Sequence, residues 1–219
     1  MIRAAMSTSH IALLGDSIFD NAAYTGGAPD VATHLRALLP PGWGASLLAV
    51  DGSTTRDLGP QVAQVDAGVT HVVVSMGGND ALLNSDLLNM PVGSTAEALV
   101  LFGRRIDAFK ASYVAALDSI LALGRPTTVC TVYEGNLGPV EAPLARVALM
   151  TFNDVILRAA FERAVDVIDL RLVCTEASDY ANPIEPSGSG GKKIADAIVA
   201  AVGARETRAA SRVFARSNR

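Results

Sequence analysis

Three polar loops, each directly after an apolar run, carry residues of this 219-residue chain that could act together on one substrate. The first carries Ser17 in the run LLGDS, the second Gly52 in DGS, and the third Asn79 in GGND. A serine hydroxyl is a weak nucleophile, so it needs a base and donors for the oxyanion that forms when it attacks a carbonyl. The backbone N–H groups of Ser17 and Gly52 and the side-chain amide of Asn79 would supply three such donors.

The elements that must position these loops alternate between short apolar runs and longer segments with helical spacing. This alternation predicts a single flavodoxin-like domain, a three-layer α/β/α sandwich around a five-stranded parallel sheet. Ligands bind such sheets beyond the carboxyl ends of the strands, where all three loops fall. The expected strands cover residues 11–14, 46–50, 71–76, 127–132 and 165–170, and the expected helices cover 30–39, 57–65, 95–123, 143–163 and 191–202.

These loops, in this order, resemble the first three sequence blocks of the SGNH hydrolase family, also called GDSL esterases and lipases. Residues 15–17 match the first block, Gly52 the second and residues 77–80 the third, and the resemblance extends from about residue 10 to residue 202. It implies acyl-enzyme chemistry at Ser17, with Gly52 and Asn79 as oxyanion donors. We group Asp16 with them as a substrate-binding residue. No cofactor and no metal ion are expected.

In its last sequence block this chain departs from the pattern of that family. In the family it holds an aspartate, two further residues, a histidine that takes the serine proton, and a proline. Residues 178–188 of this chain contain no histidine. The three histidines, His10, His34 and His71, fall at two predicted strand starts and in a predicted helix, so we expect structural roles for them.

Two alignments of the last block compete. The gap-free version, which we favour, puts Glu185 at the histidine position, Pro186 at the proline and Asn182 at the aspartate. The other puts Asp179 at the aspartate and Asn182 at the histidine. A carboxylate can act as a base when burial or a nearby carboxylate raises its pKa. The hypothesis is that Glu185 takes the proton of Ser17, directly or through a water.

Composition limits the remaining possibilities. The net charge of −4 gives no electrostatic footprint for nucleic acid. No apolar run is long enough to cross a bilayer, and the first nine residues are too short and polar for a signal peptide, so we expect a cytoplasmic protein. Residues 1–203 are expected to form the domain, and residues 204–219 a basic C-terminal tail. Cys130 and Cys174 are expected to be buried free thiols.

Together these features predict a serine-dependent hydrolase of carboxylic esters with a non-standard base. The substrate would be a small-molecule ester, either a short acyl ester or an acetyl group on a sugar. Two alternatives stay open: a catalytically degenerate ligand-binding protein on the same fold, and an acyltransferase. The chain could also form a homo-oligomer.

Overall fold

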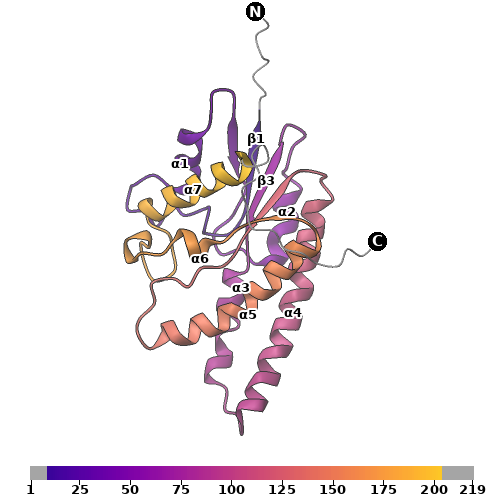
Figure 1. The fold of residues 1–219 in the computed structure, drawn as a ribbon, viewed down its shortest axis with the longest axis vertical. Helices are drawn as coiled ribbons and strands as arrows, with labels where there is room; N and C mark the ends of the chain where they lie inside the picture. The colour runs from indigo at the N-terminus through magenta and orange to yellow at the C-terminus, as the bar shows by residue number, and fades with distance from the viewer. Residues whose placement is uncertain (1–8, 204–219) are drawn as a thin grey trace, which may run out of the picture.

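The computed structural model describes residues 9–203 of the chain, and the predicted tail at residues 204–219 lies outside this part. One parallel sheet runs through the domain in the strand order β2-β1-β3-β4-β5 (Figure 1). Every neighbouring pair of strands is parallel. This is the flavodoxin-like order, so the predicted fold class is confirmed. The strands are β1 (His10–Gly15), β2 (Gly44–Leu47), β3 (His71–Ser75), β4 (Thr127–Cys130) and β5 (Asp166–Ile168).

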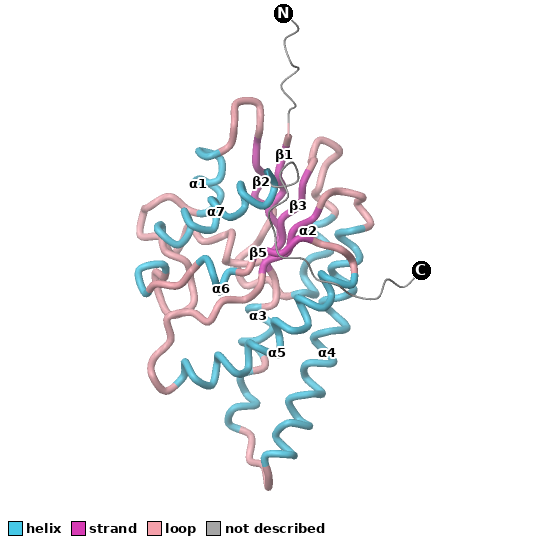
Figure 2. The backbone as a smooth tube through the Cα atoms, viewed as in Figure 1, coloured by secondary structure: helices cyan, strands magenta, loops and turns pink. Residues whose placement is uncertain are grey.

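Helices connect the strands and cover both faces of the sheet (Figure 2). The α-helices are α1 (Val31–Leu38), α2 (Leu58–Val62), α3 (Gly78–Leu83), α4 (Thr95–Leu121), α5 (Glu141–Glu162), α6 (Leu170–Val173) and α7 (Gly188–Gly203). Three short 3-10 helices are η1 (Thr55–Asp57), η2 (Ser85–Asn89) and η3 (Ala177–Asp179).

The two faces of the sheet bury different sets of side chains because residues alternate along each strand. Ala12 and Leu14 of β1 pack into a core with Phe109 of α4 and Ile156 of α5. The other core contains Ile11 and Leu13 of β1 together with buried residues of α1 and α7, among them Leu35, Ile194 and Ile198. Helices α2, α4 and α5 therefore cover one face, and α1 and α7 the other.

Helices α4 and α5 are much longer than the strands that they connect. In Figures 1 and 2 the N-terminal parts of α4 and α5 lie beyond the carboxyl edge of the sheet, beside α3, and their C-terminal parts pack against the sheet. This extension forms a wall beside the strand ends, which is where the three polar loops lie. The fold therefore positions the candidate site between the sheet edge and these helices.

Candidate active site

Ser17 lies in the turn that follows β1, and Gly15 fixes the course of the chain into that turn. Gly15 has a positive φ of 125°, and a Cβ atom there would overlap the carbonyl oxygen of Ser75 on β3. The side-chain amide of Gln61 also binds both backbone groups of Gly15. Its oxygen receives the Gly15 N–H at 2.8 Å, and its nitrogen donates to the Gly15 carbonyl at 2.9 Å. Only glycine fits this position. The turn therefore leaves the sheet at a fixed place with Ser17 behind it.

The Ser17 hydroxyl donates a hydrogen bond to Oε1 of Glu185 at 3.1 Å. Both residues are buried, with exposed fractions of 8% and 6%. The other carboxylate oxygen of Glu185, Oε2, is buried and has no hydrogen-bond partner among the described residues. The structure thus brings together a serine hydroxyl and a carboxylate that lie 168 positions apart in sequence.

The loop that carries Glu185 is held from several sides. Tyr133, just after β4, donates its hydroxyl to the carbonyl of Ile184 at 2.7 Å. Asn21, four residues after Ser17, donates to the carbonyl of Pro186 at 3.1 Å and also receives the Val31 N–H at the start of α1. These contacts fix the backbone on both sides of Glu185, so its carboxylate has little freedom to leave Ser17.

The two other residues proposed for the last block have different contacts. The side-chain oxygen of Asn182 receives the backbone N–H groups of Ile184 and Glu185, both at 2.9 Å. Asn182 therefore shapes the loop through its backbone. The fully buried Asp179 receives the N–H of Glu176 and forms an ion pair with Lys193 of α7, with Nζ 2.8 Å from Oδ1. Among the described contacts, none joins Asp179 or the Asn182 side chain to the Ser17 hydroxyl.

The second and third polar loops are tied to each other. The Asn79 amide nitrogen donates to the Ser53 carbonyl at 2.9 Å, which leaves one of its two N–H groups for a ligand. Asn79 lines the same cavity as Ser17. Gly52, next to Ser53, has a positive φ of 79° and is exposed, and it is not among the cavity-lining residues. The structure thus places Asn79 in the site and Gly52 in the adjoining turn.

Two carboxyl groups of the site have raised pKa values. Burial, together with the charges of Glu185 and Asp80, raises the pKa of Asp16 from 3.8 to about 7, against a hydrogen bond from the Ile18 N–H that lowers it. Burial also raises the pKa of Glu185 above 4.5, opposed by the hydrogen bond from Ser17 and helped by the charge of Asp51. A carboxylate with a raised pKa is a stronger base, which suits it to accept a proton from a serine.

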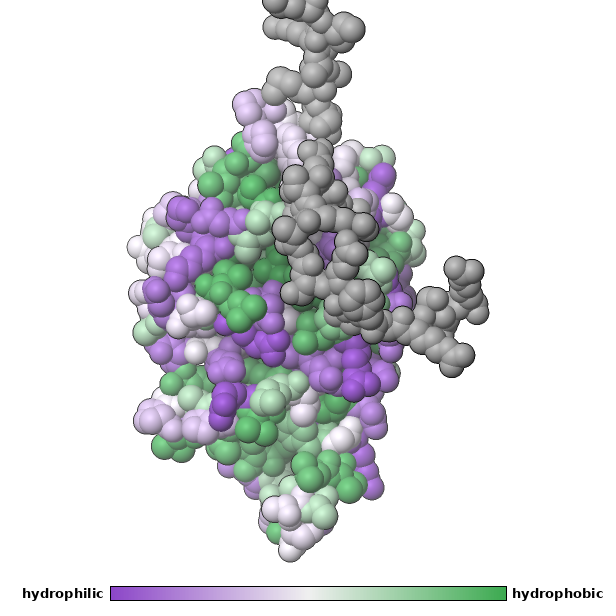
Figure 3. Space-filling model, in the orientation of Figure 1, coloured by the Kyte–Doolittle hydropathy of each residue, from purple (hydrophilic) through white to green (hydrophobic). Residues whose placement is uncertain are grey.

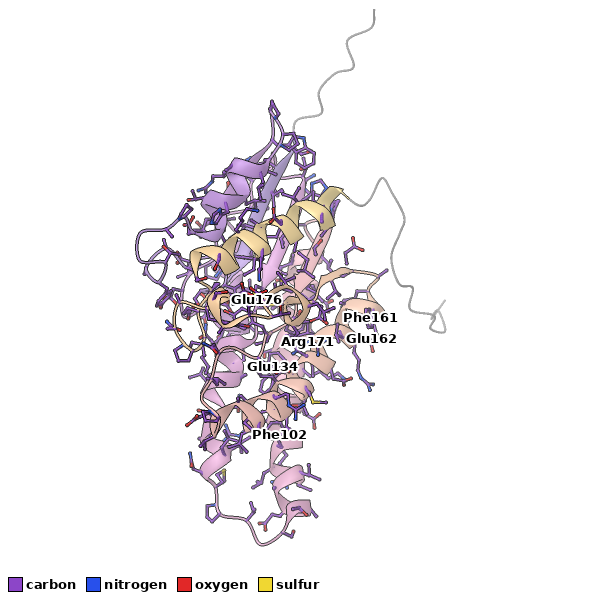
Figure 4. All side chains as sticks on the ribbon, turned by 60° about the vertical axis from the view of Figure 1, so that its left-hand side comes forward. Phe102, Glu134, Phe161, Glu162, Arg171 and Glu176 are labelled. Atoms are coloured by element: carbon purple, nitrogen blue, oxygen red, sulfur yellow. The ribbon has the colours of Figure 1, made fainter. Side chains whose placement is uncertain are left out.

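A cavity of about 170 Å³ opens at Ser17 and extends under α3, η2, α4 and α5. Asp16, Ser17, Asn79 and Glu185 all line it, so four of the predicted site residues share one space. Glu134, in the loop after β4, lines it as a further carboxylate. In Figure 4, Glu134 lies close below the sheet, and Phe102 of α4, another lining residue, lies further from the sheet.

The three histidines all lie away from this cavity, within residues 9–203 that the structure describes. His10 and His71 begin β1 and β3 at the opposite end of the sheet, and His34 lies in α1. The His10 ring shares a hydrogen bond with Ser46 at 2.7 Å, and the His71 ring stacks on Trp43. In the same part of the chain no three His, Cys, Asp or Glu side chains are grouped to hold a metal ion.

Three residues organise the site through contacts that the sequence did not predict. Asn21 and Tyr133 hold the Glu185 loop, and Gln61 holds Gly15. Gln61 did carry a signal: it is a polar residue at an inward-facing position of a helical pattern and is buried. The contacts of Asn21 and Tyr133 are with backbone carbonyls far away in sequence, which no local pattern encodes.

The sequence matches the family model of the GDSL-like lipase/acylhydrolase family over residues 13–191. The chain therefore belongs to this family, as the sequence blocks predicted. No curated protein matches the chain significantly. None of the helices in residues 9–203 is both long and apolar enough to span a membrane.

Solved structures with the same fold include several esterases and lipases. The lipase Lip_vut3 from a goat rumen metagenome has a TM-score of 0.68 and 16% identity, covering 89% of this chain and 97% of its own. An extracellular lipase from Streptomyces rimosus has a TM-score of 0.64 and 16% identity, covering 89% and 100%. An acetyl xylan esterase from Geobacillus stearothermophilus has a TM-score of 0.65 and 19% identity, covering 90% and 95%. At these identities the similarity shows the fold.

Proposed function

We propose that this protein hydrolyses carboxylic esters through Ser17, with Glu185 as the general base in place of a histidine. The observation that carries the proposal is the 3.1 Å hydrogen bond from the Ser17 hydroxyl to the buried Glu185 carboxylate. Family membership supports an acylhydrolase in general. The assignment of the base rests on the geometry of this chain alone.

The reaction follows from the positions of these groups. Ser17 Oγ attacks the ester carbonyl as its proton passes to Glu185, and the new oxyanion is stabilised by the Ser17 N–H and the remaining Asn79 N–H. The proposal keeps the Gly52 N–H as a third donor. For this role the turn that holds Gly52 would have to move its N–H into the site when the substrate binds. The alcohol leaves with the proton from Glu185, and a water then cleaves the acyl-enzyme with the same carboxylate as base.

Asp16 and the other residues of the last block have supporting roles in this proposal. Asp16 lies next to Ser17 and lines the cavity, so it contacts the substrate. Asn182 orients Glu185 through the loop backbone, and Asp179 anchors that loop to α7. Both are positioning residues in this scheme.

The test compares the purified wild type and four variants on p-nitrophenyl butanoate. Ser17→Ala should abolish turnover, and Glu185→Gln should lower kcat/KM by about 10²-fold or more, the usual contribution of a general base. Glu162→Gln is the matched control, because it makes the same change at the exposed end of α5. Folding of each variant is checked by circular dichroism.

Four results would contradict the proposal. Unchanged turnover in Glu185→Gln, or a comparable loss in Glu134→Gln, would reject Glu185 as the base. If a fluorophosphonate fails to label Ser17 while an acylated ligand binds tightly, the protein is a ligand-binding module. If the acyl group passes to an added alcohol in preference to water, it is an acyltransferase.

A further inference from the structure

The cavity that opens at Ser17 is divided by polarity. Asp16, Ser17, Asn79 and Glu185 line it at the sheet edge, and Asn84, Ser85 and Arg105 form a second polar group among the helices. The rest of the lining beyond the sheet edge is mostly apolar. Its apolar residues include Leu82, Leu87, Leu88, Phe102, Ile106, Leu137, Ala145, Ala148, Leu149 and Phe152.

Three helical segments each turn one apolar face toward this space. Ala145, Ala148, Leu149 and Phe152 have the spacing of a single face of α5. Phe102 and Ile106 do the same on α4, and α3 with η2 contribute leucines from a third side. The apolar part is thus a slot built from the helices that extend beyond the sheet, and it is continuous with the serine.

The mouth of the slot leaves apolar surface in contact with water. Leu82 and Leu88 both line the cavity and have exposed fractions of 48% and 51%. Figure 3 shows hydrophobic residues gathered on the lower half of the molecule, over the helical extension. Exposed apolar surface of this kind is typical of a ligand-binding groove.

One charged group from α4 interrupts the apolar lining of the slot. The guanidinium of Arg105 donates to Asn84 Oδ1 at 3.1 Å and to Asp86 Oδ2 at 2.9 Å, so its charge is already paired. Arg105 and Asn84 both line the cavity. An apolar chain that covers this pair would have to desolvate it, which is unfavourable. The acyl chain should therefore lie against the apolar walls and not against this pair.

We propose that the slot between α3, η2, α4 and α5 binds the acyl chain of a short- to medium-chain fatty acyl ester, from butanoyl to octanoyl, with the ester carbonyl at Ser17. This inference rests on the proposed function and names its substrate class. An acetyl group ends in a single methyl and would leave most of the cavity of about 170 Å³ unfilled. A sugar would need more polar partners than the mostly apolar slot offers.

The first experiment measures kcat/KM for p-nitrophenyl acetate, butanoate, hexanoate, octanoate and dodecanoate. Each methylene that enters the slot should raise kcat/KM by about fourfold, the usual gain from burying one methylene. The rise should stop before dodecanoate. A flat profile, or one that is highest for acetate, would overturn the inference.

Variants of the slot test its location. Ala148→Phe should fill it and shift the optimum toward acetate, and Phe102→Ala should enlarge it and shift the optimum toward longer chains. Val147→Phe is the matched control, since it adds a ring to the next residue of α5, which is 61% exposed and outside the lining. If all three share the wild-type profile, the acyl chain binds elsewhere.

The outcomes separate this inference from the function on which it rests. Absence of turnover on every ester, together with absence of fluorophosphonate labelling, would reject the hydrolase. Turnover that is unaffected by chain length would leave the hydrolase in place and reject only the acyl slot. The Phe102→Ala variant removes atoms from a partly exposed wall, so it keeps the test informative if Ala148→Phe does not fold.

Discussion

The buried carboxyl of Asp16 should make the protein less stable as the pH rises, and Asp16→Asn should remove that effect. The folded-state pKa of about 7 lies above the ordinary 3.8, so folding favours the protonated form. The stabilising contribution is therefore complete below about pH 4 and is lost as the pH rises through about 7. Asparagine keeps the oxygen that receives the Ile18 N–H and carries no charge.

The magnitude follows from the size of the shift. From 3.8 to about 7 is about three pKa units, and each is worth about 1.4 kcal/mol, so the charged carboxyl costs up to about 4 kcal/mol. Urea unfolding followed by the fluorescence of the single tryptophan, Trp43, measures the free energy of unfolding. Asp16→Asn should exceed the wild type by up to about 4 kcal/mol near pH 8.5, and by much less near pH 5.

The control is Asp154→Asn, which removes a carboxylate from the exposed face of α5 where it pairs with Arg158. This change should alter the free energy of unfolding only slightly, because surface ion pairs contribute little. A difference between Asp16→Asn and the wild type that is equal at both pH values would refute the reasoning. It would mean that Asp16 ionises in the folded protein as readily as in the unfolded chain.

Three further outcomes are expected. Gly15→Ala should lower the free energy of unfolding by more than about 3 kcal/mol in the same urea assay, because the added methyl group would overlap the Ser75 carbonyl. Gly26 also has a positive φ, but it has open space around it, so Gly26→Ala should lower the free energy of unfolding by only about 1 kcal/mol. Asn21→Ala should lower the free energy of unfolding by about 1–3 kcal/mol, because it leaves buried backbone groups without hydrogen-bond partners. It should also lower kcat by a larger factor than it changes KM. An unaltered kcat would contradict the positioning role of Asn21. The value of kcat/KM should rise with pH, with the midpoint of the rise above pH 4.5, because Glu185 must be ionised to act as a base and its pKa is raised. In Glu185→Gln any residual activity should lack this rise.

Much of the fold could be predicted because its signals are local. Apolar runs of the right length and helical spacing located every strand and the long helices. The predicted strands at 46–50 and 127–132 run past the observed ends at Leu47 and Cys130. The reason is that hydropathy continues after the strand pairing stops: Leu48 and Ala49 both donate to the Leu13 carbonyl in place of a regular ladder.

Helix α3 was not predicted, and α7 begins earlier than the predicted residue 191. Helix α3 begins inside the third polar loop at Gly78, and α7 begins at Gly188 within a segment rich in Gly and Ser that is typical of a loop. In both cases packing against the rest of the domain decides the structure, for example at Gly190, whose missing side chain makes room for the Asp179 backbone. Local propensity cannot report such contacts.

The candidate site could be predicted as far as the residues that follow strands. The alternation of strands and helices placed Ser17 and Asn79 at one edge, and the position of Glu185 in the last block suggested its nearness to Ser17. Which atoms touch could not be derived, because Glu185 depends on contacts from Asn21 and Tyr133 that reach across the whole sequence.

The two cysteines are free and buried, with exposed fractions of 1% for Cys130 and 5% for Cys174, as predicted. Burial also raises the pKa of both thiols. Alkylating reagents act on exposed thiolates, so they should modify these sulfurs only when the domain opens. The chain therefore carries its own reporter of domain opening: the rate of thiol alkylation measures how often the core beneath α1 and α7, which contains both cysteines, comes apart, whether or not an ester is being cleaved.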